Sequence, residues 1–342
     1  MGYILQALLL AASATRVLGS CSYGTFLQPR AEDGAVPIST FGYFGAKGPL
    51  NWAALEVPAN SACATGTRQS PINMVAGVFN LVAATDLVIE VPNFPEGTEF
   101  ENLGSTVEVI AKGGKLAFAG KEFELEQFHF HLPSEHLDNG TSQAMEMHMV
   151  WQSATKEIAV IGVYIEIAKE GAAAAPAAVA APAAAAPARE VVAGAPGAEV
   201  VPPGVVVAVG EGPARRRRFQ QRRQAAPARG PTTLLETIFS VADQIKVPGT
   251  KTKTPPLVLT EVVDILKSGA FQGYSGSLTT PPCSEGVNWN VATAKLSILP
   301  ATFERVRNII GFNSRIPQNT PGLPNIVQVG GAAAMAALVA TK

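Results

Sequence analysis

Two short segments with alternating side chains place three histidines where they can meet. Residues 127–131 read Gln-Phe-His-Phe-His, so in a β-strand His129 and His131 lie on one face and the two phenylalanines on the other. Residues 145–150 alternate in the same way, with Glu146 and His148 on one face. The turn-forming residues 133–140 between them favour antiparallel pairing. The pattern therefore predicts a sheet that gathers three imidazoles on one face.

The grouping of the histidines indicates a metal site. The chain has four histidines in 342 residues, and all four lie between His129 and His148. A single histidine in a strand is usually structural, but scattered structural histidines rarely gather in this way. Three imidazoles without a fourth protein ligand are typical of a catalytic zinc site, whereas structural zinc is usually closed by four Cys-rich ligands. We therefore predict that His129, His131 and His148 bind zinc.

A second motif lies far downstream, where residues 277–282 read Ser-Leu-Thr-Thr-Pro-Pro. Each proline fixes its own φ and restricts the residue before it, so this loop can hold a hydroxyl at a fixed point. Together the two stretches resemble the α-class carbonic anhydrases, of the secreted eukaryotic microbial or fungal type. Further similar segments occur at residues 41–43, 52, 69–73, 159–162 and 313–315.

The resemblance implies zinc-dependent, reversible hydration of carbon dioxide to bicarbonate and a proton, by attack of zinc-bound hydroxide. It also implies that Gln127 and Glu146 hold the outer nitrogens of His129 and His148. Thr279 would orient the hydroxide and donate its own proton to a buried Glu135, which without the family pattern reads as a surface carboxylate.

The resemblance further implies an apolar wall for carbon dioxide, with Thr280 beside the substrate. The wall positions are Val150, Val160, Leu278, Val287 and Trp289. Read from the residues alone, each of these side chains is explained nearly as well by packing in a core.

One position departs from the pattern of the fast members of the family. Where those enzymes carry a histidine that passes protons to solvent, this chain has Ser105. The fourth histidine, His136, matches a buried structural position and cannot replace it. We therefore expect slower proton transfer that depends on buffer.

Alternating apolar residues at 87–91, 106–110 and 287–296 predict strands, and the segments 232–245 and 259–266 look helical. This pattern predicts a mainly β (α+β) fold. The resemblance implies a single domain over residues 41–329, with a large central twisted, mostly antiparallel sheet, a few surface helices and zinc in a cone-shaped cleft. Residues 20–40 precede the domain. The small apolar residues 330–342 form a tail, and its terminal Lys argues against a lipid-anchor signal.

Several features predict export to an extracellular or periplasmic-type space. Residues 1–19 resemble a signal peptide and are too short for a membrane span. Residues 18–21, Leu-Gly-Ser-Cys, leave a bacterial lipoprotein signal as an alternative. Asn139 begins an Asn-Gly-Thr glycosylation site. The resemblance implies a disulfide between Cys63 and Cys283, which leaves Cys21 to be removed, free or used between chains.

An insertion at residues 171–230 differs in composition from both flanks, being rich in Ala, Pro, Gly and Val. We predict that it is disordered and interrupts the domain at a surface connection. It carries eight Arg and three Glu, whereas the whole chain has a net charge of −1. Solvated disorder is favoured over nucleic-acid binding, and the run of arginines at 215–218 also invites proteolytic processing.

Two other classes of protein remain as alternatives. A cupin-like metal protein also uses His-x-His followed by Glu, as at His129, His131 and Glu135, but its second motif is absent after His148. A non-catalytic binding or adhesion protein on the same fold would be signalled by loss of a ligand, and all three histidines are present. The expected partners are carbon dioxide and bicarbonate, without nucleic acid or a transmembrane span, in a monomer or homodimer.

Overall fold

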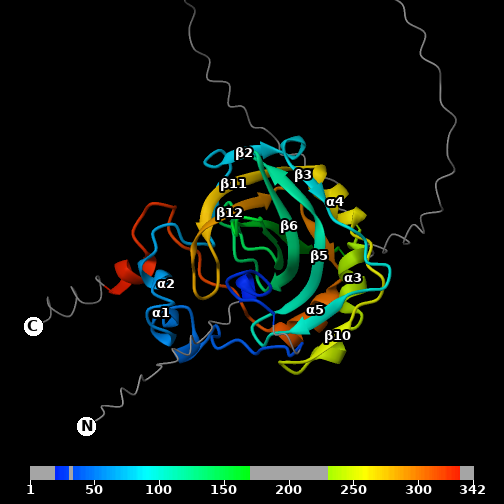
Figure 1. Ribbon diagram of the computed structural model, residues 1–342, viewed down its shortest axis with the longest axis horizontal. Coiled ribbons are helices and arrows are strands. Elements are labelled where there is room, and N and C mark those ends of the chain that lie inside the picture. The colour runs from blue at the N-terminus through cyan, green and yellow to red at the C-terminus, as the bar shows by residue number, and fades with distance from the viewer. Residues whose placement is uncertain (1–19, 31–33, 170–229, 332–342) are drawn as a thin grey trace, which may run out of the picture. The chain divides into compact units, whose positions relative to one another are not determined.

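The computed structural model describes residues 20–30, 34–169 and 230–331 of the chain (Figure 1). The predicted signal peptide, most of the predicted insertion and most of the predicted tail lie outside these residues. The described residues all belong to one compact unit. None of their helices has the length and apolar character needed to cross a membrane.

A large mixed sheet dominates the described residues. Its nine strands along the main path are, in spatial order, β10 (Lys251–Lys253), β4 (Glu99–Asn102), β5 (Val107–Phe118), β6 (Lys121–His131), β8 (Met145–Gln152), β9 (Ile158–Ile167), β12 (Glu285–Ala292), β11 (Ala270–Ser277) and β2 (Asn80–Ala83). Beside this path, β3 (Val88–Glu90) pairs with β5 and β13 (Leu296–Ile298) pairs with β9. The pairs β12–β9 and β13–β9 are parallel and the others antiparallel. The expectation of a large, mostly antiparallel central sheet is confirmed.

Short helices and a small sheet surround this framework. A parallel pair joins β1 (Asn73–Met74) to β7 (Leu137–Asp138). The α-helices are α1 (Trp52–Leu55), α2 (Ala62–Thr65), α3 (Thr233–Phe239), α4 (Thr260–Lys267) and α5 (Pro300–Ile310). The 3-10 helices are η1 (Ser20–Ser22), η2 (Gly45–Lys47), η3 (Ala84–Asp86) and η4 (Ala242–Ile245).

Two predicted elements are each divided in two. The predicted helix 232–245 consists of α3 and η4, because Ser240 ends α3: its hydroxyl bonds to the carbonyl of Thr237 and competes with the helical pattern. The predicted strand 287–296 consists of the end of β12 and the start of β13. These breaks shift the boundaries of the elements without changing their type.

The alternation along β6 separates the core from the candidate site. Phe128 and Phe130 are fully buried in the main core, and the ring of Phe130 lies 4.8 Å from that of Phe239 in α3. Figure 1 shows α3 and α5 beside this part of the sheet. His129 and His131 point to the opposite face because successive strand residues alternate.

The antiparallel register of β6 and β8 fixes the relation between the three histidines. His129 lies directly opposite His148, and His131 lies opposite Glu146. Directly opposed residues in an antiparallel pair bring their side chains within contact distance on one face. The sheet therefore supplies a rigid base for the imidazole group.

Candidate metal centre

Three imidazole rings form a compact, solvent-excluded group on one face of β6 and β8. The rings of His129, His131 and His148 are each 0% exposed. Their centroids lie 5.0 Å apart for His129 and His131, 5.3 Å for His129 and His148, and 4.5 Å for His131 and His148. The structure thus brings together the three residues that the sequence analysis expected to meet.

Each ring is held through its outer nitrogen. His129 Nδ1 lies 2.8 Å from Gln127 Oε1, His131 Nδ1 lies 2.9 Å from the carbonyl oxygen of Asn313, and His148 Nε2 lies 2.9 Å from Glu146 Oε1. An acceptor on the outer nitrogen fixes the tautomer, because that nitrogen must carry the proton. The lone pairs are therefore on Nε2 of His129, Nε2 of His131 and Nδ1 of His148.

The inner nitrogens of two rings have no hydrogen-bond donor facing them. Among the described residues, neither His131 Nε2 nor His148 Nδ1 has a hydrogen-bond partner. A buried polar atom without a partner is costly, so such atoms in a native site point to a ligand that satisfies them. One ring nitrogen from each of the three histidines and the sulfur of Cys21 all lie within 4.8 Å of one another.

Burial keeps the three imidazoles neutral. Burial lowers the pKa of His131 to about 3, and it holds the pKa of His129 well below its ordinary value. The pKa of His148 is also lowered, first by burial. Metal ligation requires neutral imidazole, so the site is ready to bind a cation without first losing protons at neutral pH.

Glu146 joins the metal-facing group to a wider hydrogen-bond network. Its Oε1 accepts from His148 and from His136 Nδ1 at 2.7 Å, and His136 Nε2 lies 2.7 Å from the hydroxyl of Tyr274. Although burial alone would raise it, the interactions with His136 and His148 hold the pKa of Glu146 well below its ordinary value. His136 therefore holds the Glu146 carboxylate in place, and this carboxylate in turn holds the ring of His148.

A glycine makes room for this carboxylate. A Cβ at Gly162, on the neighbouring strand β9, would lie 2.8 Å from Glu146 Oε1. Real Cβ atoms do not approach other atoms so closely, so the carboxylate can occupy its place only because residue 162 has no side chain.

Glu135 lies beside the imidazoles and in contact with Thr279. Glu135 is fully buried, and its Oε1 accepts the backbone N–H of Arg315 at 2.9 Å. Its Oε2 lies 3.5 Å from His131 Nε2. Burial raises the pKa of Glu135 well above its ordinary value, and contacts with Arg315 and Thr279 oppose this. A cation at the histidines would lower that pKa again.

The predicted apolar wall forms one buried cluster. Its members Val150, Val160, Leu278, Val287 and Trp289 are all at most 2% exposed, and they pack together in a cluster separate from the main core. The ring of Trp289 lies 4.8 Å from that of His148. The structure therefore brings this wall against the metal-facing group.

Ser105 lies away from solvent. It is 4% exposed, and its hydroxyl lies 2.6 Å from that of Ser39. Asn139, by contrast, is exposed at a turn, and the sequence prediction of glycosylation there stays a prediction.

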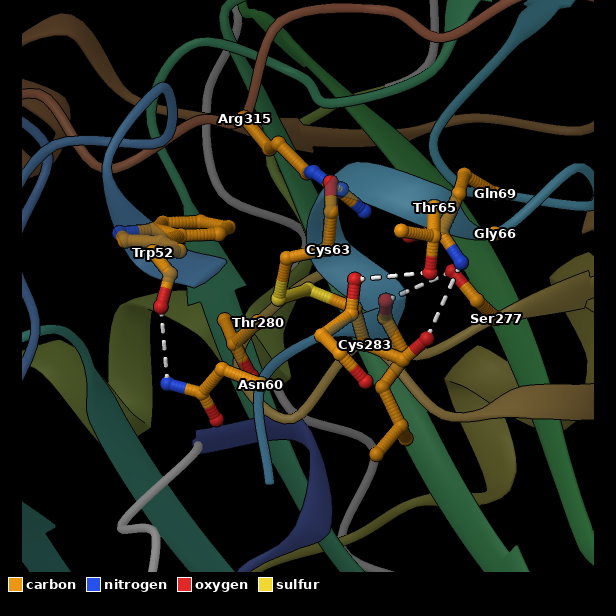
Figure 2. Close-up of a disulfide and its surroundings, with 12 residues drawn as sticks. Trp52, Asn60, Cys63, Thr65, Gly66, Gln69, Ser277, Thr280, Cys283 and Arg315 are labelled. Carbon is orange, nitrogen blue, oxygen red and sulfur yellow. Dashed lines mark hydrogen bonds between the residues drawn. A yellow bond between two sulfur atoms is a disulfide. The ribbon is translucent and has the colours of Figure 1, made fainter. Parts of the chain in front are cut away.

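The expected disulfide joins Cys63 in α2 to Cys283 in the Thr-Thr-Pro-Pro loop (Figure 2). Two side chains from other segments support it. Arg315 donates to the carbonyl of Cys63 at 3.2 Å, and Gln69 donates to the carbonyl of Cys283 at 3.1 Å. Figure 2 also shows Thr280 beside this bridge, so the disulfide anchors the loop that carries Thr279 and Thr280.

Three residues at the site had no role in the sequence analysis. Asn313 holds His131 through its carbonyl, and Arg315 holds Glu135 through its backbone N–H. Residues 313–315 were noted only as a family-like segment, because a backbone contact leaves no trace in the type of side chain. The third residue is Cys21, whose sulfur lies 3.4 Å from His129 Nε2. It is 1% exposed, so it is not available to another chain in this arrangement.

Comparisons with known proteins agree with this geometry. The model of the eukaryotic-type carbonic anhydrase family matches residues 47–180 and 224–320. A carbonic anhydrase of Nostoc is 27% identical over 281 residues, covering 82% of this chain and 80% of the relative. One of Pectobacterium carotovorum is 30% identical over 253 residues, covering 73% and 75%.

A solved structure is similar over most of the chain. The fungal α-carbonic anhydrase from Aspergillus oryzae superimposes with a TM-score of 0.66 at 30% identity, covering 85% of this chain and 98% of that one. Since the family model covers more than half of the chain, the protein belongs to the eukaryotic-type carbonic anhydrase family, whose enzymes hydrate carbon dioxide.

Proposed function

We propose that this enzyme hydrates carbon dioxide reversibly at a zinc ion held by His129, His131 and His148. One observation carries the proposal. The outer nitrogen of each ring is fixed by an acceptor, while the inner nitrogens face a common point and two of them lack a hydrogen-bond partner among the described residues. Neutral imidazoles in this number suit zinc.

When bound, zinc would supply a nucleophile by lowering the pKa of a water molecule, to about 7 in carbonic anhydrases as a class. The remaining chemistry belongs to the protein. Gln127 and Glu146 keep the rings of His129 and His148 in the orientation that ligation needs. The backbone carbonyl of Asn313 does the same for His131.

Thr279 and Glu135 orient the nucleophile. Glu135 Oε1 is already used by the N–H of Arg315, so Oε2 is the carboxylate oxygen left to accept the Thr279 proton. Once the hydroxyl donates to Glu135, its oxygen can only accept from a second partner. A nucleophile beside Thr279 must therefore present its hydrogen to Thr279 and its lone pair to the substrate.

The substrate is small and apolar, and the wall suits it. Val150, Val160 and Leu278 offer no hydrogen bonds, so carbon dioxide would be held by shape and by exclusion of water. Thr280 supplies a polar group at the edge of this wall, where bicarbonate would form. The buried Ser105 cannot relay protons, so buffer would carry them to solvent.

The wider context is also proposed. A signal peptide at 1–19 would direct secretion of the enzyme, with a glycan at Asn139. Residues 41–329 would form the catalytic domain, interrupted by the insertion at 171–230, and the protein would act as a monomer or homodimer. The disulfide agrees with an oxidising compartment.

The test is stopped-flow hydration of carbon dioxide together with measurement of bound zinc. The wild-type chain should bind one zinc ion, and His129→Ala should lose both zinc and activity. Thr279→Val should keep the zinc and lose activity by about 100-fold, because an orienting group is removed without a ligand. If the zinc-loaded protein is inactive both as the wild type and as Cys21→Ala, which removes the buried thiol beside His129, the result would favour a non-catalytic binding protein.

A further inference from the structure

The structure points to a fourth metal-facing group that comes from the N-terminal segment. Cys21 Sγ and one ring nitrogen each of His129, His131 and His148 all lie within 4.8 Å of one another. Cys21 is the only cysteine of the chain outside the disulfide, and it is buried. Its sulfur lies 3.4 Å from His129 Nε2 and 3.0 Å from Thr279 Oγ1.

We propose that Cys21 is a fourth protein ligand of the metal and that residues 21–30, here called the strap, close the catalytic site. The proposal rests on the function proposed above. Three histidines and one thiolate would make four protein ligands, the number that closes a tetrahedral zinc site to water. A catalytic zinc site needs its fourth position for water. The form in which Cys21 occupies that position is therefore inactive.

Two further observations support this assignment. His131 Nε2 and His148 Nδ1 are fully buried, lack a hydrogen-bond partner among the described residues, and belong to the same close group as the sulfur. A ligand bound between them would satisfy both atoms. The second observation is that Cys21 contacts Thr279 and Thr280, the two hydroxyl groups that the nucleophile and the substrate would contact.

The strap fills the space proposed for the substrate. Cys21 packs in the same apolar cluster as Val150, Leu278 and Trp289, and Leu27 packs against that cluster. The backbone N–H of Cys21 donates to Thr280 Oγ1 at 3.3 Å. The sulfur lies beside Thr279, where the nucleophile would be oriented. Carbon dioxide and the strap therefore cannot occupy this wall together.

The strap is held by specific contacts and is not a loose end. Arg30 pairs with Glu101 at 3.0 Å and with the fully buried Glu108 at 2.5 Å. The Arg30 guanidinium lies 4.6 Å from the centre of the Tyr23 ring. Gln127, which also holds His129, donates to the carbonyl of Tyr23 at 3.4 Å. In Figure 1 the strap is the darkest blue segment and lies beside the lower end of β6.

Within the strap, backbone hydrogen bonds fix its turn. Gly24 N–H donates to the carbonyl of Gln28 at 2.9 Å, and Thr25 N–H donates to that of Ser22 at 3.0 Å. Ser22, Tyr23, Thr25 and Gln28 are each at most 2% exposed. Burial of polar residues with their bonds made indicates a built contact between strap and site.

Closure and opening exchange one ligand for another. The Cys21 thiol loses a proton when its sulfur binds the metal, and a water molecule takes the vacated position when the strap leaves. An alkylating reagent would trap the open form, because the thiolate attacks the carbon of iodoacetamide, a sulfur–carbon bond forms and iodide departs.

The first measurement is the absorption spectrum of the secreted, cobalt-substituted protein, after intact mass has shown whether Cys21 is present. A thiolate-to-cobalt charge-transfer band in the near ultraviolet is expected in the wild type. The band should vanish in Cys21→Ala, while the visible bands of tetrahedral cobalt remain. A mature chain that lacks Cys21, or one that contains it without the band, would overturn the proposal.

The second measurement follows activity and alkylation in matched variants. If the strap closes nine molecules in ten, Cys21→Ala should raise the rate of carbon dioxide hydration about tenfold. Arg30→Ala keeps the thiol but loosens the strap, so iodoacetamide should modify its Cys21 faster than that of the zinc-loaded wild type. Equal alkylation rates in wild type and Arg30→Ala would count against the strap as the closing element.

The two proposals fail in different ways. A charge-transfer band with no hydration activity in wild type or Cys21→Ala would retain the ligand and reject the catalytic function. Full activity in the wild type without the band would retain the function and reject the ligand.

Discussion

Removal of the disulfide should destabilise this protein strongly. Cys63 and Cys283 are separated by 220 positions in the sequence, so the bridge closes a very long loop. In the chain-entropy model a loop of this length stabilises the folded state by about 5 kcal/mol at 25 °C, and measured effects are typically about 2–4 kcal/mol. That is a large part of the roughly 5–15 kcal/mol by which a domain is stable.

The assay is thermal and urea unfolding of the double variant Cys63→Ala/Cys283→Ala, in a Cys21→Ala background so that no free thiol complicates the comparison. The matched control is the Cys21→Ala chain with the bridge intact. We expect a loss of about 2–5 kcal/mol. Activity should fall as well, because the bridge anchors the loop of Thr279 and Thr280. A loss below about 1 kcal/mol would refute the reasoning, since the bridge would then not constrain the unfolded chain.

Four further predictions concern the site and the chain around it. Glu146→Gln and Gly162→Ala should each weaken zinc binding by about 10–100-fold in a chelator competition, with Glu122→Gln as an exposed control; unchanged affinity in both would contradict the role of the carboxylate. In metal-free protein the folded-state pKa of His131 is about 3 against an ordinary 6.5. As the pH falls from 6.5 toward 3, the unfolded imidazole takes up a proton that the folded one does not, so the free energy of unfolding drops by up to about 1.4 kcal/mol per pH unit. His131→Gln should flatten that drop in pH-dependent melting curves. Hydration by Cys21→Ala should rise with buffer concentration, and a rate insensitive to buffer would show another proton path. Cleavage within residues 215–223 should give two bands in reducing electrophoresis and one band without reductant, because the disulfide joins the two pieces; a single full-length band under both conditions would exclude processing.

The sheet could be predicted from the sequence because its pattern is local. Phe128 and Phe130 alternate with His129 and His131, so the period of two reports both the strand and its faces. The boundaries near Ser240 and Ala292 were missed, because a side-chain hydrogen bond and a change of strand partner decide where those elements end. Neither effect changes the hydrophobic pattern.

The three histidines could be named from their spacing, but the side chains around them could be named only through the family resemblance. Glu135 follows a strand and reads as a surface carboxylate, yet it is fully buried because residues 313–315 from the far end of the chain cover it. Asn313 holds His131 through its backbone carbonyl, which any residue type could supply. Contacts of this kind depend on chain segments about 180 residues apart, and no local pattern encodes them.

The position of Cys21 at the site also depends on a contact between distant segments and could not be predicted from its neighbours in the sequence. The sequence identifies it only as the cysteine outside the expected disulfide, next to the predicted signal peptide. Nothing in the neighbouring residues connects it with His129. The connection arises because Arg30 pairs with Glu101 on β4 and Glu108 on β5, which turns the N-terminal segment back over the imidazoles. Both the strap and the disulfide-anchored loop then meet at Thr279, one supplying a competing ligand and the other holding the orienting hydroxyl. Access to the metal is thus controlled by a segment outside the matched family region, which begins at residue 47, while the chemistry belongs to residues inside it.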